Sequence, residues 1–272
     1  MTSLPDCKNL LLTREGSRLS ILLNRPESRN ALGGEMVPEL LSVVEYLEQA
    51  RDIACVLLRG AGGTFCAGGD IKGFMAQFKS PPPAPGERDP IALNNRRFGT
   101  FLKRFDSLPQ TNVVAVEGAA FGGGLGLASI GDVVIAMADT RFAMSETGLG
   151  VVPAQIAPFV AARIGVSAAR RIALTGMRFD GREAARIGLV HHVCEDKPAF
   201  EATLAKVLVD VNRCAPGANA ATKRLLLASR STPLDALLDD AADAFAAALR
   251  SDEGREGVTA FLEKRPAVWI DK

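Results

Sequence analysis

The sequence predicts an α/β fold, and three observations support that prediction. Short apolar segments rich in β-branched residues alternate with longer segments whose apolar residues recur at helical spacing. Several of the short segments end in clusters of glycine, as buried strands do where the chain turns. The chain has 272 residues, 47% of them hydrophobic and 23% charged, so it can bury a substantial core.

The first half of the chain begins with a hairpin and continues with alternating helices and strands. Residues 9–26 alternate in polarity around a turn at residues 15–16, which predicts two antiparallel strands. The elements expected next are a helix over residues 31–50, a buried strand over 53–60, a proline-rich surface loop over 79–89, a helix over 91–108 and a strand over 111–118. The apolar face of the first helix is formed by Leu40, Val43, Val44 and Leu47.

The second half contains short strands and becomes helical toward its end. The elements expected there are two strands within residues 131–146, helices over 153–165 and 167–176, a strand over 188–195 and helices over 199–212, 217–229, 234–250 and 252–264. We therefore expect an α/β core domain over residues 1–195. A helical region over residues 196–272 should pack its apolar faces against a neighbouring subunit.

Charge and cysteine content argue against several classes of function. The net charge is +1 with acidic and basic residues interleaved, so a general nucleic-acid or membrane-surface role is not expected, although a local basic patch for a phosphorylated ligand is compatible. The five cysteines are scattered without a CxxC pair, which indicates a reducing compartment and no disulfide framework. No signal peptide or bilayer-spanning run is recognised, so we expect a cytoplasmic protein.

The two histidines of the chain do not predict a catalytic or metal site. His191 and His192 are adjacent in an expected strand, so their side chains should point to opposite faces. A Ser–His–acid triad or a histidine-rich metal centre would have to form around this pair, and the sequence beside it shows no pattern typical of either site. We predict no metal site.

Two glycine-rich turns stand out because each follows a buried strand. The first spans residues 67–70 and the second spans residues 122–124. Backbone N–H groups at such positions lack partners, and without side chains in the way they can be directed at a bound oxygen. Two donors, one from each turn, would stabilise a carbonyl oxygen that becomes negative during a reaction, helped by the positive end of the helix after the second turn.

Three further roles for these glycines compete with an anion site. They could serve only close packing between a helix and a strand, which is what a single glycine run would indicate. A phosphate loop is a weaker alternative because neither turn ends in Gly-Lys-Ser/Thr. A dinucleotide site is weaker still because the run GGGLGL does not match GxGxxG.

Several segments, in order and at the same spacing, resemble the crotonase superfamily of enoyl-CoA hydratases and isomerases. They are LNRPESRNAL at residues 23–32, FCAGGDIKGF at 65–74, VAVEGAAFGGGLGLASIGDVVIA at 114–136, RFAMSETGLGVVP at 141–153, ALTGMRFDGREAARIGLVHHV at 173–193 and GVTAFLEKRPAVW at 257–269. The resemblance covers almost the whole chain. It implies a spiral core of repeated ββα units, a C-terminal region that forms a homotrimer or a dimer of trimers, and an acyl-CoA thioester substrate that brings its own coenzyme A and needs no cofactor.

The resemblance also implies roles for individual residues. It places the oxyanion-hole donors on the N–H groups of Gly69 and Gly123, and a catalytic carboxyl group on Glu146. The positions that it implies along coenzyme A are Arg25, Ala67, Gly68, Asp70, Ile71, Phe261 and Lys264.

The residues themselves give Glu146 a suitable setting and reveal one departure from the family pattern. Glu146 lies between a strand and a glycine turn among apolar neighbours, which should raise the pKa of its carboxyl group. Taken alone, Glu146 would more simply be a loop or helix-capping carboxylate. Hydratases with a full pair carry a second glutamate where this chain has Gly126. Asp70 and Asp132 are expected to brace local structure instead.

Three functions fit these residues. The segment SETGLGVVPAQIAPFVAARIG looks like the hydratase subgroup that acts on methylglutaconyl-CoA or isohexenylglutaconyl-CoA, whose distal carboxylate could help orient water and could bind to Arg96, Arg97 or Gln155. An enoyl-CoA isomerase with Glu146 as the proton shuttle is the first alternative. A non-catalytic acyl-CoA-binding protein is the second, although a pure binder has no need of an apolar-flanked carboxyl group.

Overall fold

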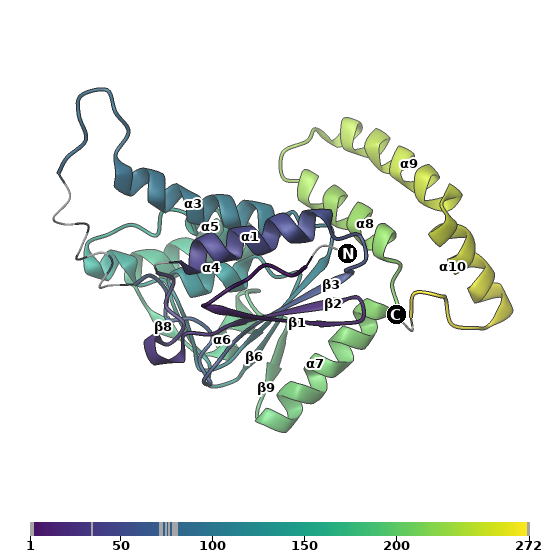
Figure 1. Ribbon diagram of the computed structural model, residues 1–272, viewed down its shortest axis with the longest axis horizontal. Coiled ribbons are helices and arrows are strands. Elements are labelled where there is room, and N and C mark those ends of the chain that lie inside the picture. Colours follow the sequence, from purple (N-terminus) through teal and green to yellow (C-terminus); the bar gives the residue numbers. More distant parts are fainter. Residues whose placement is uncertain are drawn as a thin grey trace.

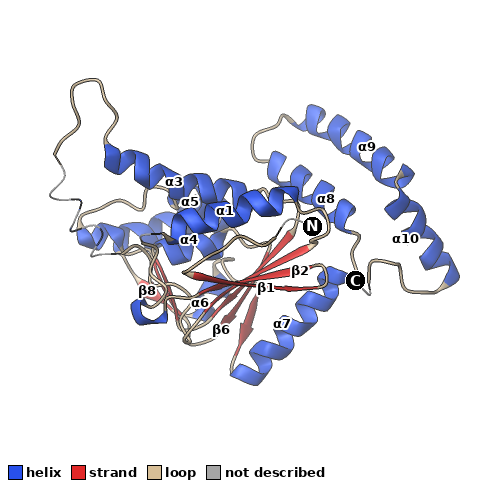
Figure 2. Ribbon diagram, in the orientation of Figure 1, coloured by secondary structure: helices blue, strands red, loops and turns tan. Residues whose placement is uncertain are grey.

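The computed structural model describes residues 3–33, 35–70, 73, 75, 77 and 81–270. Its centre is a sheet of six described strands in the order β1-β2-β3-β4-β6-β9 (Figure 2). These strands are β1 (Leu10–Glu15), β2 (Arg18–Leu23), β3 (Cys55–Gly60), β4 (Thr111–Val116), β6 (Val133–Met137) and β9 (His192–Cys194). The predicted antiparallel hairpin is confirmed as β1 and β2, whereas all later neighbours in this sheet pair in parallel. Parallel neighbours need long crossovers, which the helices supply.

Helices cover both faces of this sheet (Figure 1). On one face lie α1 (Met36–Gln49), α3 (Pro90–Asp106), α4 (Gly123–Ser129) and α5 (Ala157–Thr175). On the other lies α7 (Lys197–Asn212). Because both faces are covered, β4 buries alternate side chains in two separate apolar clusters, Val114 in the larger and Val113 in the smaller. The apolar face predicted for α1 is confirmed, since its four predicted residues are all buried.

A second, smaller sheet is formed by β5 (Ala119–Phe121), β7 (Arg141–Ala143) and β8 (Arg178–Phe179). It corrects the prediction that β4 runs directly into the second glycine turn. The chain leaves β4, bends at Gly118 with φ of 67°, and forms β5 before the turn. A Cβ atom on Gly118 would lie 2.2 Å from the carbonyl oxygen of Gly63, so only glycine permits this change of sheet.

The remaining elements connect the two sheets or follow the core. They are the short 3-10 helices η1 (Pro26–Ser28) and η2 (Glu146–Leu149), and α6 (Gly181–Arg186), α8 (Pro216–Ala228), α9 (Leu234–Arg250) and α10 (Asp252–Glu263). The two helices predicted over residues 153–176 are the arms of α5, which is kinked at Gly165. No helix in the described ranges has the length and apolarity needed to cross a membrane.

The C-terminal helices differ in how they are packed. Helix α7 buries Phe200, Leu204 and Val207 against the central sheet. Helix α9 has no buried residue, and α10 has only Ala260. Both extend away from the sheets at one end of the molecule (Figure 1). The domain boundary after residue 195 stays a prediction, although α7 packs as a core helix does.

Candidate active site

The two glycine-rich turns lie directly against each other. The N–H of Phe121 donates to the carbonyl oxygen of Cys66 over 3.0 Å, which joins the segments that lead into the turns. A Cβ atom on Gly68 would lie 2.6 Å from the carbonyl oxygen of Phe121, and one on Gly124 would lie 2.4 Å from that of Cys66. Close backbone packing therefore requires glycine at these two positions. This is the packing role that competes with an anion site in the sequence analysis.

The N–H groups of Gly69 and Gly123 differ from the adjacent N–H groups in their hydrogen bonding. Adjacent N–H groups are used within the protein: that of Gly68 donates to Cys66 Sγ over 3.4 Å, and that of Gly122 to the carbonyl oxygen of Ala143 over 2.9 Å. Within the described part of the chain, no acceptor pairs with the N–H of Gly69 or Gly123. Gly123 opens α4, where an N–H has no intrahelical acceptor. Two open donors thus come from turns that touch.

Glu146 lies beside the second turn. It follows β7, which pairs with β5, and it opens η2. Its Oε1 atom lies 2.8 Å from where a Cβ on Gly122 would be, so the left-handed glycine at position 122, with φ of 49°, makes room for the carboxyl group. Its Oε2 atom is buried and has no hydrogen-bond partner among the described residues. Burial raises the pKa of Glu146, as predicted from its apolar neighbours.

Removing this carboxyl group should make the protein more stable at neutral pH. A pKa raised on folding means that the stabilising contribution of the group is present below its unfolded pKa and is lost as the pH rises through the folded value. We expect Glu146→Gln to unfold at higher urea than the wild type at about pH 8, with the difference vanishing near pH 4. The gain should be at most about 1 kcal/mol, because partial exposure screens the charge. A variant less stable than wild type at high pH would contradict the cause assigned to the shift.

Several residues predicted along coenzyme A gather at the first turn. The Arg25 guanidinium donates to the carbonyl oxygen of Ala31 over 3.0 Å and lies 4.0 Å from Asp70 Oδ2. The N–H of Ala67 donates to the carbonyl oxygen of Arg29 over 2.9 Å. The N–H of Leu32 donates to the carbonyl oxygen of Gly68 over 2.7 Å. Ile71 lies outside the described residues.

Asp70 has a clear structural role, as expected. Its Oδ1 atom accepts from the N–H of Gly73, and its side chain fills the space beside Gly33. Phe261 and Lys264, by contrast, lie at α10, toward the opposite end of the molecule from α4 (Figure 1). The side chain of Phe261 is 82% exposed. A single chain therefore does not bring these two residues to the glycine turns.

Asn30 supports the first turn, although no sequence pattern singled it out. Its side chain is fully buried; Nδ2 donates to the carbonyl oxygens of Ala61 and Thr64, at 2.9 and 2.6 Å, and Oδ1 accepts from the N–H of Arg25 at 2.8 Å. Its φ of 56° is left-handed, a conformation that asparagine tolerates better than most residues. The only sequence signal was an asparagine inside one of the family-like segments.

Replacing Asn30 should therefore cost several hydrogen bonds at once. We expect Asn30→Ala to lower the free energy of unfolding by about 2 kcal/mol, because three partly buried backbone groups lose their partner. Urea titration gives the value. Asn30→Asp keeps the acceptor and the tolerance for this φ but places an oxygen against the two carbonyl oxygens, so it should not restore the stability lost in Asn30→Ala. A loss below about 0.5 kcal/mol, the range of ordinary surface changes, would contradict this role.

The helix α3 and the start of α5 lie against the second glycine turn and the helix α4 that follows it. A Cβ on Gly123 would lie 2.6 Å from Leu32 Cδ1 and 3.5 Å from Phe98 Cε1. A Cβ on Gly99 would lie 1.9 Å from Gln155 Oε1, whose amide also donates to Asn95 Oδ1 over 2.9 Å. Gly99 thus lets the Gln155 amide lie against α3.

Both candidate carboxylate-binding arginines lie on this same helix. Arg96 donates to the Thr100 hydroxyl over 2.9 Å, and one of its nitrogens lies 3.3 Å from the Cβ position of Gly99. Arg96 is therefore near the Gln155 amide. Arg97 is exposed on α3.

Asp132 and His191, for which the sequence predicts no catalytic role, form hydrogen bonds within the protein. Asp132 accepts from the N–H of Asn112 and pairs with Lys223, each over 2.7 Å. His191 Nδ1 accepts from the N–H of Val134 over 2.9 Å. Burial, together with the nearby Arg163 and His192, lowers the pKa of His191 to about 4, so the ring is neutral at physiological pH.

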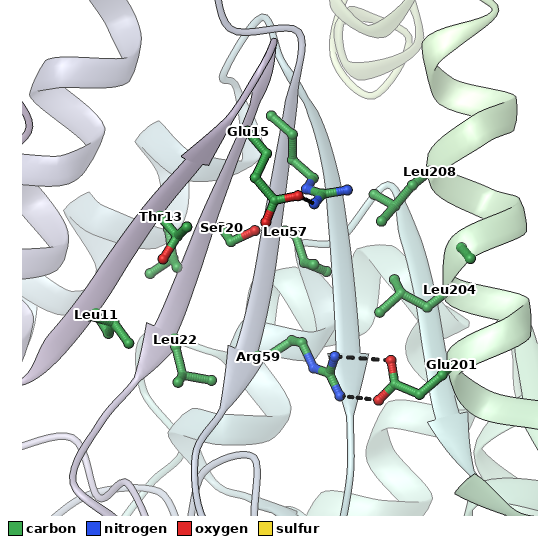
Figure 3. Close-up of a pocket in the computed structure, with 13 residues that line it drawn as sticks. Leu11, Thr13, Glu15, Ser20, Leu22, Leu57, Arg59, Glu201, Leu204 and Leu208 are labelled. Atoms are coloured by element: carbon green, nitrogen blue, oxygen red, sulfur yellow. Dashed lines mark hydrogen bonds and ion pairs between the residues drawn. The ribbon is translucent and has the colours of Figure 1, made fainter. Parts of the chain in front are cut away.

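A separate groove of about 390 Å³ lies on the other face of the central sheet, between β1 to β3 and α7 (Figure 3). Its walls are mainly apolar, with Leu57 and Leu204 among them, and the ion pair of Arg59 with Glu201 lies at one end. None of the predicted site residues that the structure describes lines this groove. Its charged groups are already paired, so we do not place the chemistry there.

The fold and the site define a class of protein: an enzyme of mixed α/β fold whose adjoining glycine turns present amides with no partner among the described residues, beside a carboxyl group with a buried oxygen. Residues 13–272 match the sequence model of the enoyl-CoA hydratase/isomerase family, and the chain belongs to that family. Its predicted crotonase fold and its predicted enzyme class are confirmed, and the family implies an acyl-CoA substrate.

Individual relatives agree over nearly the full length. AtuE of Pseudomonas aeruginosa is 50% identical, with a TM-score of 0.91 over 97% of this chain and 100% of that one. The short-chain-enoyl-CoA hydratase of Clostridium acetobutylicum is 29% identical over 96% of this chain and 97% of its own. The 1,2-epoxyphenylacetyl-CoA isomerase of Escherichia coli is 32% identical over 93% and 95%, respectively.

Proposed function

We propose that the protein is an enoyl-CoA hydratase that adds water reversibly across the C2=C3 bond of a branched glutaconyl-type thioester. The observation that carries this proposal is the buried Oε2 atom of Glu146, which, like the nearby Gly123 amide, has no partner in the part of the chain that the structure describes. A buried polar atom without a partner is costly, and such groups concentrate where a substrate completes them.

The proposed reaction uses the two amides and Glu146 in sequence. The thioester oxygen accepts hydrogen bonds from the N–H groups of Gly69 and Gly123. Glu146 takes a proton from water while the water oxygen bonds to C3, and the electron pair of the double bond moves toward the thioester oxygen, which becomes an enolate held by the amides. The protonated Glu146 then gives the same proton to C2. Its raised pKa favours holding the proton between these two steps.

The proposed substrate class rests on the polar groups of α3. Gln155 is held against this helix by Asn95, and Arg96 lies near it, so an amide and a guanidinium are available for a distal carboxylate. Arg97 is a further candidate. Coenzyme A would run along Arg25, Ala67, Gly68, Asp70 and Ile71, and no further cofactor is proposed.

The test is to incubate the protein with 3-methylglutaconyl-CoA and with crotonyl-CoA, and to follow the loss of enoyl absorbance. We expect hydration of the first substrate with the higher kcat/KM. Arg96→Leu should raise KM for 3-methylglutaconyl-CoA and leave that for crotonyl-CoA unchanged. Binding of both thioesters without any turnover would reject the enzyme in favour of the acyl-CoA-binding alternative.

Isomerisation is the second candidate, and one observation favours it. The carboxyl group beside the second turn is that of Glu146, whereas Asp70 at the first turn accepts from the N–H of Gly73, and a single glutamate suffices to move a proton between C2 and C4 of an enolate. A relative in the family is named as an isomerase. Product analysis separates the two functions, because isomerisation shifts the double bond and leaves the mass unchanged, whereas hydration adds one water.

The assembly of subunits is a related proposal. Helices α9 and α10 leave large apolar side chains exposed, Phe245 and Phe261 among them. This supports the expected homotrimer or dimer of trimers, in which Phe261 and Lys264 would reach coenzyme A bound to a neighbouring copy. Light scattering of the purified protein tests the assembly. A cytoplasmic location likewise stays a prediction.

A further inference from the structure

Position 126, where the family pattern has a second glutamate, is closed by another residue. A Cβ on Gly126 would lie 2.3 Å from Ile156 Cγ2 and 2.9 Å from Ile156 Cβ. Both of these atoms are close to the main chain, so they cannot swing aside as the end of a long side chain does. Ile156 is 3% exposed and caps the start of α5, which fixes its backbone. No side chain fits at position 126 while Ile156 is in place.

Ile156 also lies close to the reacting carboxyl group along α4. The N–H of Gly126 donates to the carbonyl oxygen of Gly122 over 3.0 Å, so these glycines are one helical turn apart. Glu146 lies against Gly122 and Ile156 lies against Gly126. On this side of Glu146 the neighbouring group is therefore the branched hydrocarbon side chain of Ile156. A carboxylate in the same place would be able to hold water, and the hydrocarbon is not.

We propose that Ile156 is a specificity-determining residue, because it occupies the space of a second proton-transferring group and leaves the water to be ordered by Glu146 and by a polar group of the substrate itself. This inference rests on the proposed function. It predicts that unsubstituted enoyl thioesters are poor substrates because they bring no such group, and that the barrier to accepting them is steric as well as chemical.

The steric part can be tested without any substrate. Gly126→Ala adds the single Cβ atom that would touch Ile156, so it should lower Tm even though alanine favours helices. In Gly126→Ala/Ile156→Ala the 2.3 Å contact with Cγ2 is removed and only the 2.9 Å approach to the Cβ atom of residue 156 is left, so the loss caused by alanine at position 126 should shrink. Ile156→Val keeps Cβ and Cγ2 and serves as the matched control, in which the loss should persist. Additive changes in Tm for the two alanine substitutions would overturn the proposal.

The chemical part compares variants that differ only at position 126. Crotonyl-CoA hydration by Gly126→Glu/Ile156→Ala should exceed that by Gly126→Ala/Ile156→Ala by about 10-fold or more, since a positioned acid or base contributes 10²- to 10⁴-fold. Gly126→Glu with Ile156 retained should show no such gain.

The outcomes separate this inference from the proposed function. An equal gain with Ile156 retained would overturn the role of Ile156. No gain in a folded double variant, alongside wild-type hydration of 3-methylglutaconyl-CoA, would overturn it too. A wild-type protein that hydrates neither thioester would reject the proposed function instead, and the Tm measurements would still decide whether Ile156 closes position 126.

Discussion

Glu146→Gln should lower kcat at least about 10³-fold while the thioester binds with nearly unchanged affinity. Positioned acids and bases typically contribute 10²- to 10⁴-fold, and here the same carboxyl group is proposed to serve both proton transfers. Glutamine preserves the size of the side chain and one acceptor oxygen, so the contact with Gly122 should survive. Stopped-flow turnover and calorimetric titration with a non-reactive acyl-CoA measure the two effects.

Two controls make this result specific. Glu117 forms ion pairs with Arg59 and Lys197 away from the amides, so Glu117→Gln should leave turnover within a few-fold of wild type. Glu146→Asp keeps a carboxyl group but places it further from the substrate, because the side chain is shorter. This variant should retain more activity than Glu146→Gln. Turnover that survives in Glu146→Gln would remove this residue from the mechanism.

The pH dependence should report the same group. Glu146 acts first as a base, so kcat/KM should fall as the pH drops through its pKa, and burial places that limb above the ordinary range of a glutamate. A substitution that lets water reach the carboxyl group should move this limb toward lower pH.

The fold could be predicted where the signal is local and repeated. Alternation in residues 10–23 marked the hairpin, and the 3.6-residue period of α1 marked its buried face. The three-residue strands β5 and β7 gave no such signal, because so short a segment shows no period and depends on its neighbours for pairing. The bend at Gly118 that separates β4 from β5 is required by an approach to Gly63, which is distant in sequence.

The site was predictable in its chemistry and not in its packing. The motif around residues 65–74 and the glycine run indicated open amides, and the apolar flanks of Glu146 indicated a raised pKa. That Gly68 and Gly124 serve backbone contact, or that Ile156 closes position 126, follows only from segments brought together by folding. The absence of a glutamate at position 126 was visible in the sequence, whereas the contact of that position with Ile156 was not.

Gly123→Pro should lower kcat/KM by about 10²- to 10³-fold relative to Gly123→Ala, because only the proline variant loses the N–H that would hold the enolate oxygen. Residue 123 is the first of α4, where proline is tolerated since that N–H has no helical acceptor. Both substitutions add a Cβ near Leu32 Cδ1, the mobile end of a side chain, so this contact is common to the pair.

The comparison isolates one hydrogen-bond donor from the shape of the turn. Circular dichroism and Tm should show similar folding of the two variants, and affinity for a non-reactive acyl-CoA should differ much less than kcat/KM, because the amide acts most strongly on the charged oxygen. If the proline and alanine variants turn over equally fast, the Gly123 amide does not stabilise the reacting oxygen. The negative charge on the thioester oxygen would then have to be stabilised by a group other than the Gly123 amide. The proposed proton transfers of Glu146 depend on that stabilisation, so the mechanism would have to be revised.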